Sequence, residues 1–340
     1  MRRPALPEIS LATTVAAGVP LLLAAIWYPP TAAQAWLAAY LFWIGLPVGA
    51  LFAILVHGLT GGDWGLTLRP ATAAMVRTTP LLALFLIPVL IWPQQIYPWA
   101  DGTSYGWLDL PFFAARAVLY IALWNAIAFG VERWRQPDGR LPPGLAWPAL
   151  IVLFATTTLA AFDWVMTLEP RWTSTIFGLL ITAGWVLSAI AVATAIVIRL
   201  GTTGEELDTL ARIMLALIML WAYASAVQLI VIWESDLAGE INWYLRRGAS
   251  VWFVAVLLVL SAEFGVPFLI LLWRPLRRSP AAVFAAAVLV MAAHLGETWW
   301  LTVPDFSRPF SWAEPLAIAA IGGCVLFVVG RQLSSATPLP

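Results

Sequence analysis

Six ionisable side chains lie within or at the ends of strongly apolar segments of this 340-residue chain: Arg116, Asp163, Glu169, Glu263, His294 and Glu297. Each such group costs about 2.5–3.5 kcal/mol to insert into a membrane, so it usually faces a bundle interior or water and is a candidate for function. Carboxyl and imidazole groups in such surroundings can exchange protons near neutral pH. The six residues therefore indicate proton transfer, or a site for a ligand that exchanges protons.

His294 and Glu297 stand three residues apart, a spacing that places both on one face of a helix. They can exchange a hydrogen bond there, which favours a proton relay or a site for a quinone headgroup over two unrelated residues. Trp299 follows closely and is included in the same candidate quinone site.

Glu263 is the acidic residue that lies deepest in an apolar segment. Pro267 stands four residues later and removes a backbone donor, so the helix is expected to be disturbed at this point. Two interpretations stay open for Glu263: a stepping stone for protons, and a protonated glutamate bonded to a neighbouring helix. Asp163, near the end of another segment, could also take up a proton and is a further candidate for the quinone site. The predicted proton path consists of Asp163, Glu263, His294 and Glu297.

Arg116 and Glu169 have simpler interpretations. Arg116 lies seven residues after Asp109 on the same helical face, which predicts an ion pair between these two residues at the outer interface. Glu169 stands at a helix terminus beside Pro170 and Arg171, where we expect its carboxylate to be solvated.

Composition places the chain in a membrane. Hydrophobic residues make up 62% and charged residues 11%, far from the averages of soluble domains. Segments of about 20 apolar residues cross a hydrocarbon core of roughly 30 Å as helices, because a helix satisfies its own backbone polar groups. The sequence thus predicts an all-α integral membrane protein, and its zero formal charge gives no support for nucleic-acid binding.

The chain offers few ligands for a redox centre. Its single cysteine, Cys324, excludes an internal disulfide and an iron–sulfur cluster held by this chain alone. Its two histidines, His57 and His294, are expected at different depths, so they cannot flank one haem. We therefore expect no cofactor bound by this chain alone.

Ten membrane spans are predicted, at residues 9–27, 35–57, 75–92, 112–131, 147–168, 174–200, 210–233, 251–273, 281–303 and 315–332. The first span could be a cleaved signal peptide, but its aromatic, proline-rich end is more typical of a retained anchor. Similar turns after the second and sixth spans, HGLTGGDW and LGTTGEEL, predict two parallel four-helix bundles with flanking helices. The predicted units are an anchor at 1–34, bundles at 35–172 and 173–304, and a C-terminal helix and tail at 305–340.

Arginines are distributed unevenly between the two sets of loops. Thirteen fall on one side, four on the other, and Arg116 lies within a span. The positive-inside rule then predicts that both termini are cytoplasmic. The long loops 93–110 and 234–250 face outward in this arrangement and are rich in aromatic and acidic residues, which suits partner docking.

Several segments resemble the NrfD-like membrane subunits of alternative complex III, a bacterial quinol:cytochrome c oxidoreductase, and specifically the ActF type. The stretches that carry the resemblance are YLFWIGLPVGALF (40–52), HGLTGGDWGLTLRP (57–70), IYPWA (96–100), LDLPFFAARAVLYIALW (108–124), FDWVMTLEPRWTSTIFG (162–178) and WYLRR (243–247). Glu263, His294 and Asp236 depart from the family pattern, in which histidine, arginine and asparagine are common at these positions.

The resemblance implies a subunit of a respiratory or photosynthetic complex in the bacterial cytoplasmic membrane, with a role in quinol oxidation or coupled proton translocation. It implies partner subunits that carry haem c and iron–sulfur clusters, a second NrfD-like subunit, and a quinone such as menaquinone. It also implies that this chain holds no metal itself. By motif position, Asp163, Glu169, His294 and Glu297 are candidate proton or quinone residues, and 243–247 form a structural outer loop.

Two other hypotheses compete with a proton-conducting subunit. The first is a purely structural scaffold that docks periplasmic haem and iron–sulfur subunits through the two outer loops. The second is a stand-alone secondary transporter, which a parallel rather than inverted repeat disfavours.

Overall fold

The structure is a computed structural model that describes residues 6–102, 106–306 and 308–336. All regular structure in these residues is helical, so the prediction of an all-α membrane protein is confirmed. The fourteen helices run as α1 (Leu6–Trp27), α2 (Pro29–Thr60), α3 (Asp63–Val76), α4 (Thr79–Ile91), α5 (Leu110–Trp134), α6 (Pro143–Trp164), α7 (Phe177–Arg199), α8 (Gly204–Ser235), α9 (Ala238–Gly248), α10 (Val251–Val259), α11 (Val266–Leu272), α12 (Arg274–Arg277), α13 (Pro280–Thr302) and α14 (Ala313–Ala336).

Nine stretches of the described residues are long and apolar enough to cross a membrane, and α3 with α4 makes a tenth if the two form one broken span. The third predicted span, 75–92, is therefore only partly right. The helix breaks after Val76 and bends by 40° before α4 begins at Thr79. Pro80 stands in the first turn of α4, where its missing N–H is no loss, and this favours a new helix start at that point.

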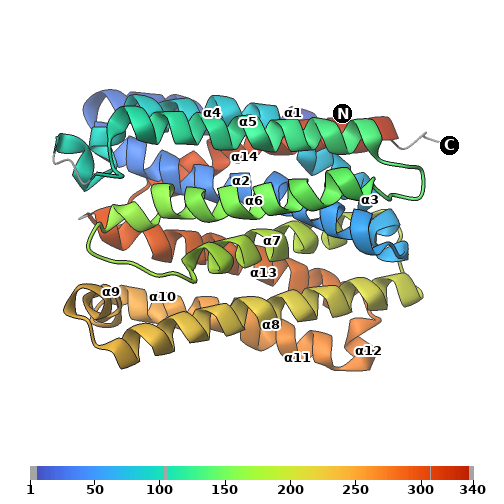
Figure 1. Ribbon diagram of the computed structural model, residues 1–340. Helices are drawn as coiled ribbons and strands as arrows, with labels where there is room; N and C mark the ends of the chain where they lie inside the picture. Colours follow the sequence, from blue (N-terminus) through green and yellow to red (C-terminus); the bar gives the residue numbers. More distant parts are fainter. Residues whose placement is uncertain (1–5, 103–105, 307, 337–340) are drawn as a thin grey trace.

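The helices are arranged as two groups of four (Figure 1). In the first group α2, α4, α5 and α6 contact one another in a ring, and in the second α7, α8, α10 with α11, and α13 do the same. Contacts between α2 and α7 join the two rings, while α1 and α14 pack together beside α2. Since α2 begins at Pro29, the predicted unit limit between residues 34 and 35 lies inside this helix.

The two ends of the bundle differ. Helices α3 and α12 lie at one end, which also holds the start of α1 and the end of α14, and we call it the α3 end (Figure 1). Helix α9 and the short 3₁₀ helices Pro93–Gln95 and Pro98–Asp101 lie at the opposite end, the α9 end. The described start and end of the chain therefore share one end of a multi-pass bundle.

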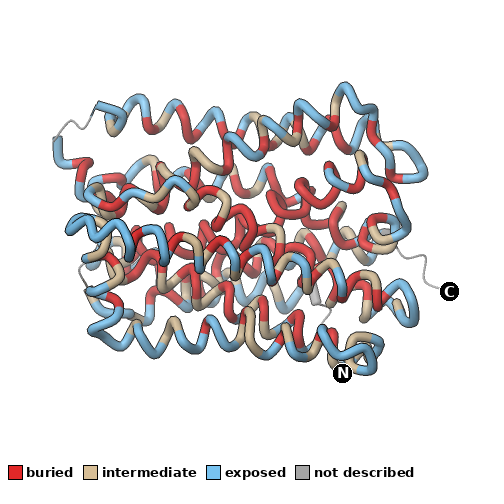
Figure 2. The backbone as a smooth tube through the Cα atoms, turned by 60° about the horizontal axis from the view of Figure 1, so that its bottom comes forward, coloured by how far each residue is buried: buried red, intermediate tan, exposed pale blue. Residues whose placement is uncertain are grey.

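Burial is concentrated in the middle of the molecule, whereas the peripheral helices alternate between buried and exposed residues (Figure 2). Helix α2 is the most enclosed span: 94% of the residues in its 18-residue apolar stretch are buried inside the protein. It crosses α7 closely because Gly45 and Gly49, one turn apart, both face Trp185. Small residues at this spacing let two membrane helices approach backbone to backbone.

Substitution of Gly49 by alanine is expected to separate α2 from α7. An added Cβ would lie 2.2 Å from the backbone oxygen of Trp185, a contact that a flexible side chain cannot relieve. We expect a loss of about 1–3 kcal/mol in the free energy of unfolding, measured by unfolding in detergent micelles. The matched control is Gly18→Ala in α1, where nothing lies within 4 Å and alanine should stabilise the helix slightly. Equal effects of the two substitutions would contradict this account of the crossing.

Candidate functional site

Three of the predicted residues meet in the interior of the second bundle. Nδ1 of His294 lies 3.0 Å from Oε2 of Glu297 and 3.9 Å from Oε1 of Glu263. We call these three residues the Glu–His–Glu cluster. One ligand atom from each lies within 4.8 Å of the others, so the three could also surround a cation.

A local break in helical regularity positions Glu263. Residues Leu260–Gly265 form a π-helical segment between α10 and α11, and the N–H of Val266 bonds to the carbonyl of Ser261, five residues back. Pro267 has no N–H to return to the carbonyl of Glu263, so the ordinary α-helical bond at this place is missing. Single π turns of this kind occur frequently at functional sites. The expected disturbance before Pro267 is therefore present, as a widened turn.

Glu263 is fully enclosed, and neither of its carboxylate oxygens has a hydrogen-bond partner among the described residues. Glu297, in contrast, has a hydrogen-bond donor, because Nε1 of Trp221 donates to its Oε1 at 2.7 Å. No ion pair in the described part of the chain joins an arginine to the cluster. An uncompensated charge in such surroundings is very unfavourable, so the cluster has to hold protons or another cation.

The cluster lies next to the crossing of the two bundles. A Cβ on Gly184 of α7 would stand 3.1 Å from Cε1 of His294 and 3.4 Å from Oε2 of Glu297. On the other side, the ring of Phe42 in α2 lies 5.9 Å from the imidazole. Glycine at 184 is thus what allows α7 to cover the cluster so closely.

Asp163 lies in the first bundle, apart from this cluster, and its carboxylate is saturated with donors. Arg116 binds it through two nitrogens at 2.8 and 2.7 Å, Tyr120 donates at 2.9 Å, and Nε1 of Trp107 donates at 2.9 Å. Both charged side chains are buried. This arrangement is a buried ion pair that fastens the loop carrying Trp107 to α5 and α6.

The predicted ion pair between Arg116 and Asp109 is wrong. Asp109 caps α5 instead, accepting a hydrogen bond from the backbone N–H of Phe112. Asp109 and Arg116 are seven residues apart, which is about 10.5 Å along a helix axis. Asp163 on the neighbouring helix, in contrast, lies directly opposite the guanidinium. No sequence pattern indicates this partner, because 47 positions separate the two residues.

Glu169 is paired rather than simply solvated. Its carboxylate accepts a hydrogen bond from Arg246 of α9 at 2.5 Å, and it is partly buried. Next to it, Arg247 forms a buried pair with Asp305 at 2.8 Å, a residue that sequence reasoning did not select. Burial lowers the pKa of Arg247, and the charge of Asp305 offsets only part of this shift. Trp243 stacks on Trp172 with ring centroids 4.6 Å apart, so α9 is firmly attached at this end.

Trp299 is not joined to the cluster by a hydrogen bond or ring contact within the described residues. Its ring packs edge-on against Phe310 at 5.0 Å, and its Nε1 is buried with no hydrogen-bond partner in the described segments. His57 lies at the α3 end of α2, fifteen residues beyond Phe42 and thus about 22 Å from the level of His294. The two imidazoles cannot flank one haem.

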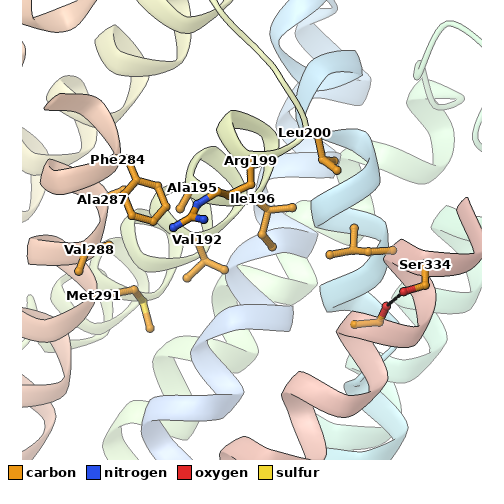
Figure 3. A pocket seen from close by; sticks show the side chains of 12 residues that line it. Val192, Ala195, Ile196, Arg199, Leu200, Phe284, Ala287, Val288, Met291 and Ser334 are labelled. Carbon is orange, nitrogen blue, oxygen red and sulfur yellow. Dashed lines mark hydrogen bonds between the residues drawn. The ribbon is translucent and has the colours of Figure 1, made fainter. Parts of the chain in front are cut away.

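A cavity of about 760 Å³ lies between α7, α13 and α14 (Figure 3). Its lining is apolar apart from Arg199 and Ser334, which stand at the α3 end. Along α13 the lining runs from Phe284 to Met291, which precedes His294 by three residues or about 4.5 Å of helix. The cavity therefore reaches from the α3 end to about one helical turn from the Glu–His–Glu cluster.

The fold and the site together define a multi-pass helical membrane protein with a buried carboxylate–histidine cluster. No protein-family model matches the chain, and no curated protein matches it.

Proposed function

We propose that this chain is a membrane subunit of a quinol:cytochrome c oxidoreductase of the alternative complex III type, and that its Glu–His–Glu cluster takes up and releases protons. The observation that carries the proposal is Glu263: a fully enclosed carboxylate 3.9 Å from an imidazole, with neither a hydrogen bond nor an arginine partner among the described residues. Intramembrane ionisable groups of this kind mark proton relays in pumps and transporters.

The geometry suits proton exchange within the cluster. Nδ1 of His294 faces both carboxylates and lies within hydrogen-bond distance of Glu297 at 3.0 Å, and a shift of about 1 Å would bring Glu263, at 3.9 Å, into the same range. Trp221 fixes Glu297 from the opposite side, which orients its other oxygen toward the imidazole. No donor in the described part of the chain holds the oxygens of Glu263, which suits a group that changes its protonation.

The proposal places the chain in the bacterial cytoplasmic membrane with both termini in the cytoplasm, so that the α9 end faces the periplasm. Subunits carrying haem c and iron–sulfur clusters, and a second NrfD-like subunit, would then dock on that end. The firmly attached α9 and Trp107, which is bonded to Asp163, are described parts of that end that such subunits could contact. A quinone is the ligand we assign to the vicinity of His294 and Glu297, with the 760 Å³ cavity as an apolar approach.

The test is performed on the assembled complex. Glu263→Gln and Glu297→Gln should each reduce proton release and quinol oxidation at least tenfold, while the complex still assembles, because glutamine has the same shape but cannot ionise. Glu205→Gln, in the exposed first turn of α8, is the matched control and should behave as wild type. Wild-type values for both cluster variants would discard the proposal.

A structural role for the first bundle is the second candidate, and the saturated Asp163 favours it. Its carboxylate holds Trp107 of the outer loop and Arg116 of α5 in one place. If the chain is only a scaffold, shortening the loop 93–110 would dissociate the complex while the cluster variants remain fully active.

A further inference from the structure

Three arginines converge on a hollow at the α3 end of the first bundle. Arg69 comes from α3, Arg77 from the bend between α3 and α4, and Arg135 directly follows α5. Together with Glu132 they line a cavity of about 260 Å³. A second cavity of about 260 Å³ adjoins the first across Arg69 and Arg77 and is also lined by Gln332 of α14.

The charges around this hollow do not balance. Glu132 is the acidic residue of the described lining, and it forms an ion pair with Arg77 at 2.9 Å. Arg69 donates to the backbone carbonyl of Pro137 at 3.1 Å and has no acidic partner within the described residues. The side chain of Arg135 has no hydrogen bond or ion pair among the described residues, and its Nε is buried. Two positive charges are therefore left without a counterion.

Arg135 is held in unfavourable surroundings as a result. Burial lowers the pKa of its guanidinium to about 10, and the charge of Arg69 acts in the same direction. It still carries a full positive charge at neutral pH. A buried donor without a partner is rare in native structures, so Nε of Arg135 offers a donor that no described residue uses and that a bound anion could use.

His57 provides a second buried polar atom without a partner in this region. It packs with Arg135 between α2 and α3, and only 1% of its surface is exposed. Its Nε2 lies 2.8 Å from the carbonyl of Gly62 and donates to it, whereas Nδ1 has no partner in the described part of the chain. His57 brings no negative charge, so it does not offset the two unpaired arginines.

The position of the hollow indicates which anion would fill it. Its lining residues Ile54, Val131 and Arg135 lie near the ends of α2 and α5, which share the α3 end of the bundle (Figure 1). The ends of membrane-spanning helices lie at the level of the lipid headgroups. Phe129 and Trp134 of α5 expose 67% and 50% of their surface, as expected for a face that contacts lipid. Guanidinium groups bind phosphate through two parallel hydrogen bonds, and basic hollows between membrane helices bind anionic headgroups.

We infer that this hollow is a binding site for a phosphate group, supplied by the headgroup of an anionic phospholipid or by a soluble phosphate, with Arg69 and Arg135 as its ligands. Glu132 holds Arg77 beside the site, so Arg77 contributes charge rather than a direct bond. This inference is independent of the proton role of the Glu–His–Glu cluster.

The test uses the full chain, purified in neutral detergent and freed of lipid. Thermal unfolding is followed while phosphatidylglycerol, phosphatidylcholine or inorganic phosphate is added. Phosphatidylglycerol should raise the melting temperature of the wild type, and the half-saturating concentration should rise about 10- to 30-fold in R69Q/R135Q. Phosphatidylcholine should act equally on both proteins. A response to inorganic phosphate that R69Q/R135Q abolishes would support the site and identify the soluble source.

Two further variants serve as controls for this test. R274Q/R278Q removes two exposed arginines at the same end of the bundle and should bind phosphatidylglycerol like the wild type. R69K/R135K keeps both charges but loses the planar fork, so it should fold and bind with intermediate affinity. The inference is overturned if wild type and R69Q/R135Q respond alike to all three additives, or if R274Q/R278Q weakens binding as much.

Discussion

Replacement of Arg116 by leucine is expected to lower the free energy of unfolding by about 3–5 kcal/mol. The substitution leaves Asp163 as an uncompensated charge at a position where 1% of the residue surface is exposed. Tyr120 and Trp107 would still donate to the carboxylate, but two neutral donors do not replace a guanidinium that supplies two bonds and a full charge. The measurement is equilibrium unfolding in detergent micelles at pH 7.

Two variants separate the charge effect from lost packing. The double variant R116L/D163L removes both charges and should recover most of the loss, because an apolar pair can replace a buried ion pair. Arg140→Leu is the exposed counterpart: its pair with Asp138 is about two-thirds solvent-accessible on the arginine side and should contribute less than about 1 kcal/mol. If Arg116→Leu were as mild as Arg140→Leu, the buried pair would not fasten the outer loop.

The buried acidic residues of the two bundles have different kinds of partners. In the first, Asp163 meets an arginine and two further donors, and all of its acceptor capacity is used. In the second, the corresponding helix α13 presents Glu297 to a histidine and a second carboxylate, with no arginine among the described ion pairs. The buried acid of the first bundle is therefore paired with an arginine, while those of the second bundle face a histidine.

Sequence alone predicted the helical spans well, because the bilayer leaves an apolar segment little choice but to form a helix. It also predicted that His294 and Glu297 would meet, since residues three apart share a helical face. The break before Thr79 was missed although Arg77, Thr78 and Thr79 interrupt the apolar run there, and Pro80 in the first turn of α4 indicates a new helix start.

Contacts between distant segments were not predictable in the same way. Glu263 joins His294 from 31 positions away, and Trp221 supports Glu297 from a third helix 76 positions away. Both contacts depend on how α8, α10, α11 and α13 are turned about their axes relative to one another. The spacing of residues within one helix does not determine these orientations. The assignment of Asp109 to Arg116 failed for this reason, because a partner on a neighbouring helix was closer.

Glu263→Leu is expected to raise the free energy of unfolding by about 1–3 kcal/mol. The substitution removes a carboxyl group whose two oxygens are buried without hydrogen bonds and replaces it with an apolar side chain of similar size. The matched comparison is Glu297→Leu, which should lower stability by about 1–3 kcal/mol, because Trp221 and His294 would each lose a partner. Both are measured by the same unfolding experiment in micelles.

The sign of the effect at Glu263 distinguishes the two interpretations that its sequence left open. A structural glutamate bonded to a neighbouring helix would be destabilised by leucine, as Glu297 is. A glutamate that carries protons is retained although it weakens the fold, so removing it should increase stability and abolish proton release together. A loss of stability in Glu263→Leu equal to that in Glu297→Leu would show that an undetected partner holds this carboxyl group, and it would remove the main support for a proton relay here.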